Sequence, residues 1–176
     1  MIDGVSALDV IPDRPPDQIA FVVRDLAVSM ATWAAALGRR DWRVHTYGPA
    51  NVHELQFRGE SSDLSMRLAM CGQEPQVELI ESLCGPNVYT EWSAHHGFGV
   101  HHIGYFVPSV RDIMCRMAAL GLAAVQSGRG YGLDGDGGFA YYDVPGIDVM
   151  VEFIEIPRRR RPSEVADITD PIRQGY

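Results

Sequence analysis

Two glutamates in a short apolar stretch near the C-terminal end pose the first chemical question. Residues 149–156 are rich in valine, isoleucine and phenylalanine, which predicts a β-strand, although glutamate is uncommon in strands. Because side chains alternate between the two faces of a strand, Glu152 and Glu155 must point to opposite sides of the sheet. One carboxylate can reach solvent, and the other faces whatever the sheet encloses. An unpaired buried carboxylate is costly, so it requires a proton, a cation or hydrogen-bond donors.

The same acidic pattern occurs once earlier in the chain. Residues 76–82 read Gln-Val-Glu-Leu-Ile-Glu-Ser, so Glu78 and Glu81 repeat the arrangement of Glu152 and Glu155. Two matching acidic strands in one small chain indicate a duplicated unit with a shared site.

The segments before the first acidic strand predict the elements that must position it. Residues 18–23 favour a strand and residues 26–37 a helix, with Asp25 as its N-cap and Gly38 as its C-cap. Three further extended runs, at residues 42–47, 52–57 and 65–71, precede the acidic strand.

The second half of the chain repeats this order. Residues 100–107 favour a strand, Ser109 is a possible N-cap, and a helix over residues 110–120 ends at Gly121. Extended runs at residues 123–126 and 139–143 follow, separated by a glycine-rich loop, and lead to the second acidic strand. The repeat is roughly 80 residues long, and each half reads βαβββ, which indicates paired modules and not a solenoid.

Length and composition describe a globular chain. Its 176 residues amount to one domain, and 46% of them are hydrophobic. A formal net charge of −8 gives no electrostatic footprint for nucleic acid. No apolar run is long enough for a membrane span, and residues 1–14 lack the apolar core of a signal peptide. Three cysteines without CxxC spacing predict reduced thiols and a cytoplasmic location.

Four short motifs carry a resemblance to a known family: Asp17-Gln18-Ile19-Ala20, Val77-Glu78-Leu79-Ile80, His101-His102-Ile103-Gly104 and Val151-Glu152-Phe153-Ile154. With them, residues 17–157 resemble the vicinal oxygen chelate superfamily, which includes glyoxalase I, methylmalonyl-CoA epimerase, extradiol dioxygenases and bleomycin-resistance proteins. The resemblance implies an α+β fold in which two βαβββ modules pair into a curved mixed sheet around a metal-binding cavity. The modules would span about residues 17–82 and 100–157 of a single domain. Residues 1–16 would form an N-terminal arm and residues 158–176 a C-terminal extension.

The resemblance also implies the ligands of one divalent metal ion: Gln18, Glu78, His102 and Glu152. An imidazole and two carboxylates suit zinc, nickel, cobalt, manganese or iron, and a glutamine oxygen completes the set. Many superfamily members have histidine where this chain has Gln18, but glutamine is the pattern of eukaryotic-type glyoxalase I. Each residue alone has a structural explanation, and their equivalent positions in a duplicated unit favour the metal. We expect His101 to be a structural histidine on the opposite face.

A metal with open coordination positions could stabilise the enolate formed when a carbon next to a carbonyl loses a proton. Glu152 is the first choice for the base or acid, and Glu78 could serve the opposite proton transfer. The chain is therefore predicted to be a metal-dependent epimerase or isomerase acting on a small molecule, either an acyl-CoA-like or a 2-oxo substrate. A glyoxalase I-type lactoylglutathione lyase and a metal-free binding protein of the resistance type are alternatives. An extradiol dioxygenase fits poorly, because the metal sites of those enzymes contain two histidines and one glutamate.

Superfamily members of this size commonly pair modules at a subunit interface, which predicts a homodimer.

Four other segments receive weaker interpretations. Residues 127–138 are expected to form a mobile rim of the cavity, with Arg129 and Tyr131 as possible substrate contacts. His95 and His96 are expected in a solvated loop. The arginines at 158–161 favour a solvated terminal face over a contact with an acidic cofactor tail. The remaining tail to residue 176 is expected to extend over a partner subunit or the module junction.

Overall fold

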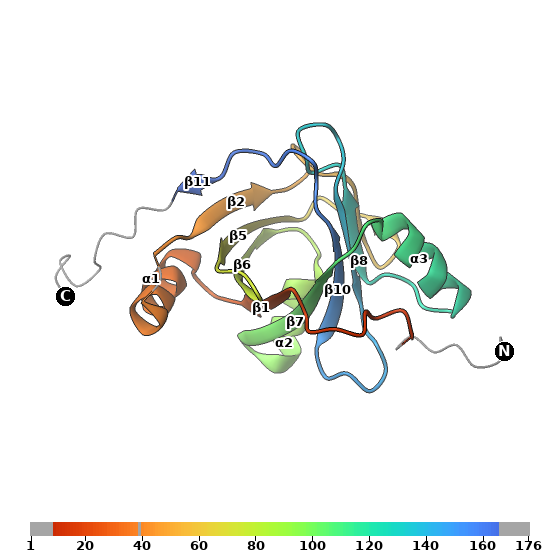
Figure 1. The fold of residues 1–176 in the computed structure, drawn as a ribbon, viewed down its shortest axis with the longest axis horizontal. Helices are drawn as coiled ribbons and strands as arrows, with labels where there is room; N and C mark the ends of the chain where they lie inside the picture. Colours follow the sequence, from red (N-terminus) through yellow and green to blue (C-terminus); the bar gives the residue numbers. More distant parts are fainter. Residues whose placement is uncertain (1–8, 39, 166–176) are drawn as a thin grey trace.

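The computed structural model describes residues 9–38 and 40–165 (Figure 1). The described helices are α1 (Leu26–Leu37), α2 (Val88–His96) and α3 (Val110–Ala119). The described strands are β1 (Gln18–Val22), β2 (Arg43–Tyr47), β3 (His53–Phe57), β4 (Glu60–Ser61), β5 (Ser65–Cys71), β6 (Gln76–Cys84), β7 (Gly99–Phe106), β8 (Gln126–Arg129), β9 (Gly138–Tyr142), β10 (Met150–Glu155) and β11 (Glu164–Val165). Among these residues, no helix is long and apolar enough to cross a membrane.

The strands form one curved mixed sheet, as the α+β prediction required. Within the described residues its order is β11-β2-β5-β6-β1-β7-β10-β9-β8-β3-β4. The first module contributes β2, β5, β6 and β1, and the second contributes β7, β10, β9 and β8. The modules join where β1 pairs antiparallel with β7, while each acidic strand pairs in parallel with the first strand of its own module. This connection places the two first strands and the two acidic strands side by side.

The β3–β4 hairpin departs from the expected arrangement of the first module. It belongs to that module in sequence, but β3 pairs with β8 at the far edge of the second module. Val52 and Leu55 are buried there in the same apolar cluster as Phe139 of β9. Non-local strand pairing thus ties the two halves together at a second place, in addition to the β1–β7 pair.

The predicted helix caps are confirmed. The Asp25 carboxylate accepts a hydrogen bond from the backbone N–H of Val28 at 2.9 Å, and Gly38 ends α1 with φ of 66°. The Ser109 hydroxyl accepts from the backbone N–H of Asp112 at 3.1 Å. These side chains satisfy backbone donors that a helix start leaves open, which is why the boundaries were visible in the sequence.

Helix α2 was not predicted, and the expectation of a loop around His95 and His96 is wrong. The buried side chain of Asn87 caps the helix by accepting from the backbone N–H of Thr90 at 2.9 Å. Only Val88 and Tyr89 of this helix are buried. Its sequence therefore lacks the long apolar stripe by which a surface helix is recognised. The expected loop from residue 127 is also partly wrong, because β8 runs from Gln126 to Arg129.

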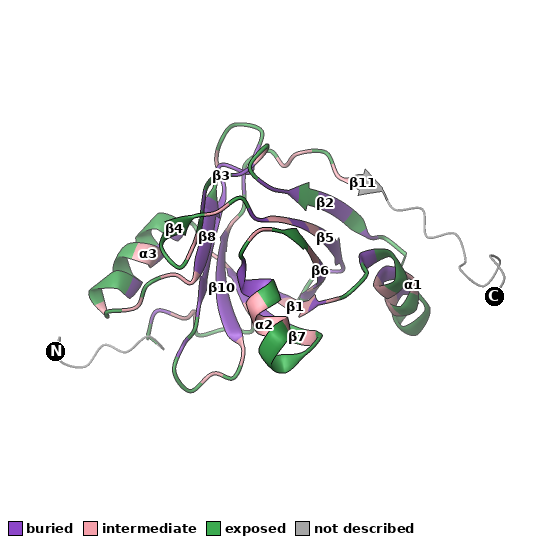
Figure 2. Ribbon diagram, turned by 180° about the vertical axis from the view of Figure 1, so that it is seen from behind, coloured by how far each residue is buried: buried purple, intermediate pink, exposed green. Residues whose placement is uncertain are grey.

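Apolar clusters lie on both sides of the sheet. One lies inside the curve and includes Ile80, Tyr89 and Tyr141, while two others lie beneath α1 and α3. The view from behind shows β10 buried along most of its length (Figure 2). Strands covered on both faces explain the near-continuous apolar runs, and they make every polar side chain inside the curve notable.

Candidate metal centre

The four predicted ligands lie on four adjacent strands in the order β6-β1-β7-β10. The strand register places Glu78 and His102 on either side of Ala20, while Gly104 lies between Gln18 and Glu152. All four predicted side chains are buried. Pairing between strands far apart in sequence therefore brings the whole predicted set to two neighbouring rows of the sheet.

Their polar atoms converge on the imidazole of His102. Its Nε2 lies 2.9 Å from Oε2 of Glu152, 3.5 Å from Oε2 of Glu78 and 3.3 Å from Oε1 of Gln18. One ligand atom from each of Glu78, His102 and Glu152 lies within 4.8 Å of the others. This buried group could hold a divalent metal ion.

Burial controls the protonation of the group. It lowers the pKa of His102 to about 3, so the imidazole is neutral near pH 7 and its contacts with carboxyl groups are not ion pairs. Burial also raises the pKa of Glu78 and of Glu152, and for Glu78 the neighbouring Glu152 charge adds to the effect. A neutral imidazole and two carboxyl groups that resist ionisation alone suit a divalent cation, which replaces the protons.

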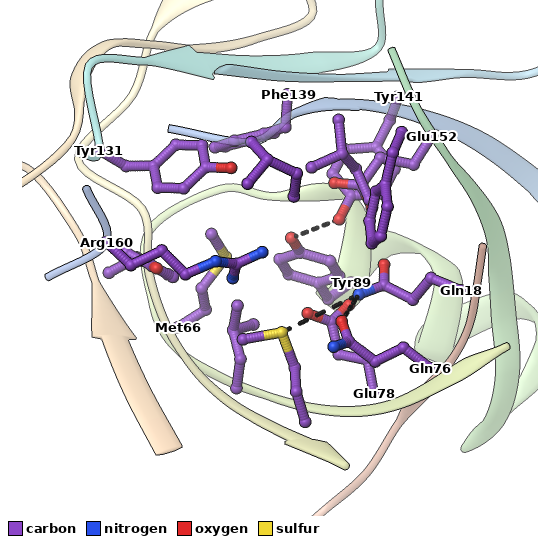
Figure 3. A pocket seen from close by; sticks show the side chains of 16 residues that line it. Gln18, Met66, Gln76, Glu78, Tyr89, Tyr131, Phe139, Tyr141, Glu152 and Arg160 are labelled. Atoms are coloured by element: carbon purple, nitrogen blue, oxygen red, sulfur yellow. Dashed lines mark hydrogen bonds between the residues drawn. The ribbon is translucent and has the colours of Figure 1, made fainter. Parts of the chain in front are cut away.

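The orientation of Gln18 fits this role. Its amide nitrogen donates a hydrogen bond to Oε1 of Gln76 at 2.9 Å, which leaves its oxygen directed toward His102. Figure 3 shows the two amides side by side at the cavity wall. Gln76 was missed from the sequence, although it lies two residues before Glu78 and therefore on the same face of β6.

His101 does not lie on the opposite face, contrary to expectation. The pairing of β1 with β7 skips one residue between His102 and Val100, so His101 occupies a bulge. Its Nδ1 lies 2.9 Å from Nδ1 of His102, and its ring is fully buried. A proton on Nδ1 of His102 leaves the lone pair of Nε2 facing the carboxyl groups, which is the tautomer a metal ligand requires.

Gly104 lets neighbouring side chains pack closely against the backbone of β7. A Cβ on this residue would lie 3.0 Å from Oε1 of Gln18 and 3.0 Å from Cδ1 of Ile154. Because Gly104 shares a face of β7 with His102, any side chain there would press on the Gln18 amide. The sequence motif contained this glycine, but its role depends on register.

Two buried tyrosines complete the wall beside Glu152. The hydroxyl oxygens of Tyr89 and Tyr141 lie 3.1 Å apart (Figure 3). A hydrogen bond from Tyr141 partly opposes the rise in the pKa of Glu152. Sequence reasoning missed both residues, because tyrosine is an ordinary core residue in strands and helices.

An inner cavity of about 50 Å³ adjoins the carboxyl groups, with Tyr131 and Arg160 among its lining residues. It meets an outer chamber of about 870 Å³, since Met70, Gln76, Phe106 and Arg160 line both spaces. By the probe measure in which one water needs roughly 10–15 Å³, the inner space holds only a few small groups. Tyr131, a predicted substrate contact, lines this inner space, whereas Nη1 of Arg129 lies 3.3 Å from Oε2 of Glu54 at the surface.

The family model of the Glyoxalase/Bleomycin resistance protein/Dioxygenase superfamily matches residues 17–142, and the chain belongs to this superfamily. A search of curated protein sequences gave no match. Solved structures share the fold. Methylmalonyl-CoA epimerase from Mycobacterium tuberculosis aligns with a TM-score of 0.57 and 19% identity, covering 81% of this chain and 88% of the epimerase. A Streptomyces coelicolor methylmalonyl-CoA epimerase in complex with 2-nitronate-propionyl-CoA aligns with a TM-score of 0.56 and 17% identity, covering 84% and 98%. A hypothetical protein from Bacillus halodurans aligns with a TM-score of 0.53 and 19% identity, covering 85% and 99%.

Proposed function

We propose that this protein is a metal-dependent epimerase or isomerase that removes and returns a proton on a carbon next to a carbonyl. One observation carries the proposal. Two buried carboxyl groups, Glu78 and Glu152, face the same small cavity from equivalent strands, with the neutral His102 between them. Superfamily membership and the fold shared with solved methylmalonyl-CoA epimerases support it.

The residues that would hold the ion are Gln18, Glu78, His102 and Glu152. A divalent ion bound there supplies Lewis acidity, which stabilises the negative charge that develops on a substrate carbonyl oxygen. The amide oxygen of Gln18 is directed inward by the contact of its nitrogen with Gln76, and a proton donated from His102 Nδ1 to His101 would leave the Nε2 lone pair facing the same space. The chain thus provides a preorganised donor set, which costs no rearrangement when substrate arrives.

Glu152 is the proposed general base. Burial raises its pKa, so it holds a proton more tightly than an ordinary carboxylate does. A base whose pKa lies near the working pH transfers protons most effectively. A bound cation lowers that pKa again, and the balance sets the basicity.

Glu78 is the proposed partner for the opposite proton transfer. It lies on β6 and Glu152 on β10, with β1 and β7 between them. A substrate carbon held between the two carboxyl groups could lose its proton to one and regain a proton from the other. Such a transfer inverts the configuration, and the reaction is an epimerisation.

The test begins with elemental analysis of protein purified without an affinity tag. A metal-free binding protein would contain no stoichiometric ion. Metal-loaded protein is then incubated in D₂O with methylmalonyl-CoA and with propionyl-CoA, and deuterium at the α-carbon is followed by mass spectrometry. We expect exchange that requires both the ion and Glu152. Absence of stoichiometric metal, or equal exchange by wild type and Glu152→Gln, would refute the proposal.

A glyoxalase I-type reaction is the second candidate, favoured by the identity of the four residues in the order Gln, Glu, His and Glu. It would shift a proton between adjacent carbons of the methylglyoxal–glutathione hemithioacetal. Formation of lactoylglutathione, followed by the ultraviolet absorbance of its thioester, distinguishes this reaction from epimerisation of an acyl-CoA.

A further inference from the structure

The four arginines that follow β10 have two different roles. Three of them fasten residues 158–161 to the loop at residues 131–136. Arg158 donates to Oδ2 of Asp136 through its backbone N–H at 2.9 Å and through Nε at 3.1 Å. Arg159 forms an ion pair with Asp134, and its carbonyl oxygen accepts from the backbone N–H of Leu133 at 2.9 Å. Nε of Arg161 donates to the carbonyl oxygen of Tyr131 at 3.2 Å.

Arg160 is different. It makes no hydrogen bond or ion pair with any residue that the structure describes, although residues on both sides of it are tied down. Its side chain extends into the cavity, toward the group that contains Glu78 and Glu152 (Figure 3). The expected solvated face is thus wrong for Arg160, while the exposed Arg158 and Arg159 agree with it.

The position of Arg160 between the two cavities defines what it can contact. It lines the inner space beside the carboxyl groups and also the outer chamber. Its charge acts on Glu78, Tyr47 and Tyr131, and it lowers the pKa of all three against the larger effect of burial. A molecule that occupies both spaces would therefore lie beside this guanidinium.

The net charge of the metal-bound centre indicates which ligand Arg160 would attract. Two carboxylates would balance the charge of a divalent ion, and Gln18 and His102 are neutral. Arg160 then leaves the inner cavity with one uncompensated positive charge. A guanidinium presents paired N–H donors that match a carboxylate, and the unmet donors favour an anionic ligand.

We propose that Arg160 binds a permanent carboxylate on the reacting end of the substrate, within a few atoms of the carbonyl that the metal centre would take. This inference rests on the proposed function and adds a substrate class to it: short acids with a carboxylate close to an activated carbonyl. The inner volume of about 50 Å³, lined by both Arg160 and Glu152, favours a carboxylate near the carbonyl. The rest of the substrate would occupy the outer chamber.

A matched pair of probes tests the inference. Malonate carries two carboxylates, and malonamate replaces one of them by an amide of the same shape. Calorimetric titration of the zinc-loaded protein should show tighter binding of malonate in the wild type. Arg160→Gln should weaken malonate binding by about 10- to 100-fold, the range for a lost hydrogen bond to a charged group, and change malonamate binding little. Arg160→Lys should fall between them, because it keeps the charge and loses the paired donors.

Arg158→Gln is the control, since it removes a neighbouring charge that faces solvent. It should bind malonate as the wild type does. The inference is overturned if malonate binds no tighter than malonamate in the wild type. It is also overturned if Arg160→Gln binds malonate normally, or if Arg158→Gln weakens it equally.

Failure of the proposed function gives a different result. Zinc affinity and α-carbon exchange are measured on the same Arg160→Gln protein, whose retained zinc affinity also shows that it folds. If the wild type binds zinc and exchanges the α-proton but does not bind malonate more tightly than malonamate, only the role of Arg160 is refuted. Loss of zinc binding and exchange in the wild type itself would refute the proposed function.

Discussion

Removing the metal should make stability depend on pH in a direction opposite to that of most proteins. Burial raises the pKa of Glu152 from 4.5 to about 8. Between these values the folded metal-free protein keeps a proton that the unfolded chain has lost. The unfolding free energy falls with rising pH wherever the folded state binds more protons than the unfolded chain. Each such carboxyl group therefore destabilises the folded protein as the pH rises.

The buried histidines limit the useful pH window. Burial lowers the pKa of His45, His101 and His102 below 6.5, so below that pH the unfolded chain binds protons that the folded protein does not. Their contribution makes stability rise with pH and opposes the carboxyl groups. Above pH 6.5 the unfolded chain also loses its histidine protons, so the opposing contribution fades, and above about pH 7.5 the carboxyl effect should dominate.

The magnitude follows from the linkage relation. One proton kept by the folded state gives a slope of about −1.4 kcal/mol per pH unit. Because the folded protein gradually loses this proton as the pH approaches 8, Glu152 alone lowers the unfolding free energy by about 1–2 kcal/mol between pH 6.5 and 8. For a chain of this size, that change lowers Tm by roughly 3–6 °C. Glu78 acts in the same direction.

Thermal unfolding followed by circular dichroism would measure the effect on EDTA-treated and metal-loaded protein. The loaded protein should show little slope, because a bound cation keeps both carboxyl groups ionised. Metal-free Glu152→Gln is the control and should show a smaller slope, since an amide does not titrate. Metal-free wild type whose stability is constant or rises with pH from 6.5 to 8 would refute the argument.

Four further predictions concern the centre and the assembly. Glu152→Gln should keep measurable metal affinity, because an amide oxygen can coordinate, but lose about 10²- to 10⁴-fold in turnover; unchanged exchange in D₂O would make Glu78 the base. His102→Ala should lose metal and activity together, and elemental analysis showing full occupancy would contradict this. Gly104→Ala should weaken metal binding by displacing the Gln18 amide, with Gly138→Ala, whose Cβ would meet nothing nearer than 3.4 Å, as the control in calorimetric metal titration. Sedimentation at micromolar concentration should show a homodimer, and a monomer alone would count against it.

Much of the fold could be predicted from local pattern. The acidic strands, the two strand–helix units and the caps Asp25, Gly38 and Ser109 follow from rules that involve residues only a few positions apart. The resemblance to the vicinal oxygen chelate superfamily implied the candidate ligands Gln18, Glu78, His102 and Glu152, and the duplicated order supported them by placing them at equivalent positions.

Three features depended on tertiary structure. The β3–β4 hairpin crosses to the second module because its apolar side chains are buried against β8 and β9, and no local pattern records that choice. His101 turns toward His102 because the β1–β7 register skips one residue, which a strict alternation of faces cannot predict. Helix α2 buries too few apolar residues to be recognised.

The difference between what the sequence determines and what the tertiary structure decides is clearest in the four arginines at residues 158–161. The sequence determined that four adjacent charges follow the last strand of the core, and charge alone predicts solvation. Only the fold decided that Asp134, Asp136 and the Tyr131 carbonyl would hold three of them and leave Arg160 inside the cavity mouth. The physical reason is that an arginine's role depends on which acceptors lie within reach. Those acceptors are 22 to 30 residues away along the chain, and they come close in a fold in which β9 pairs with β10.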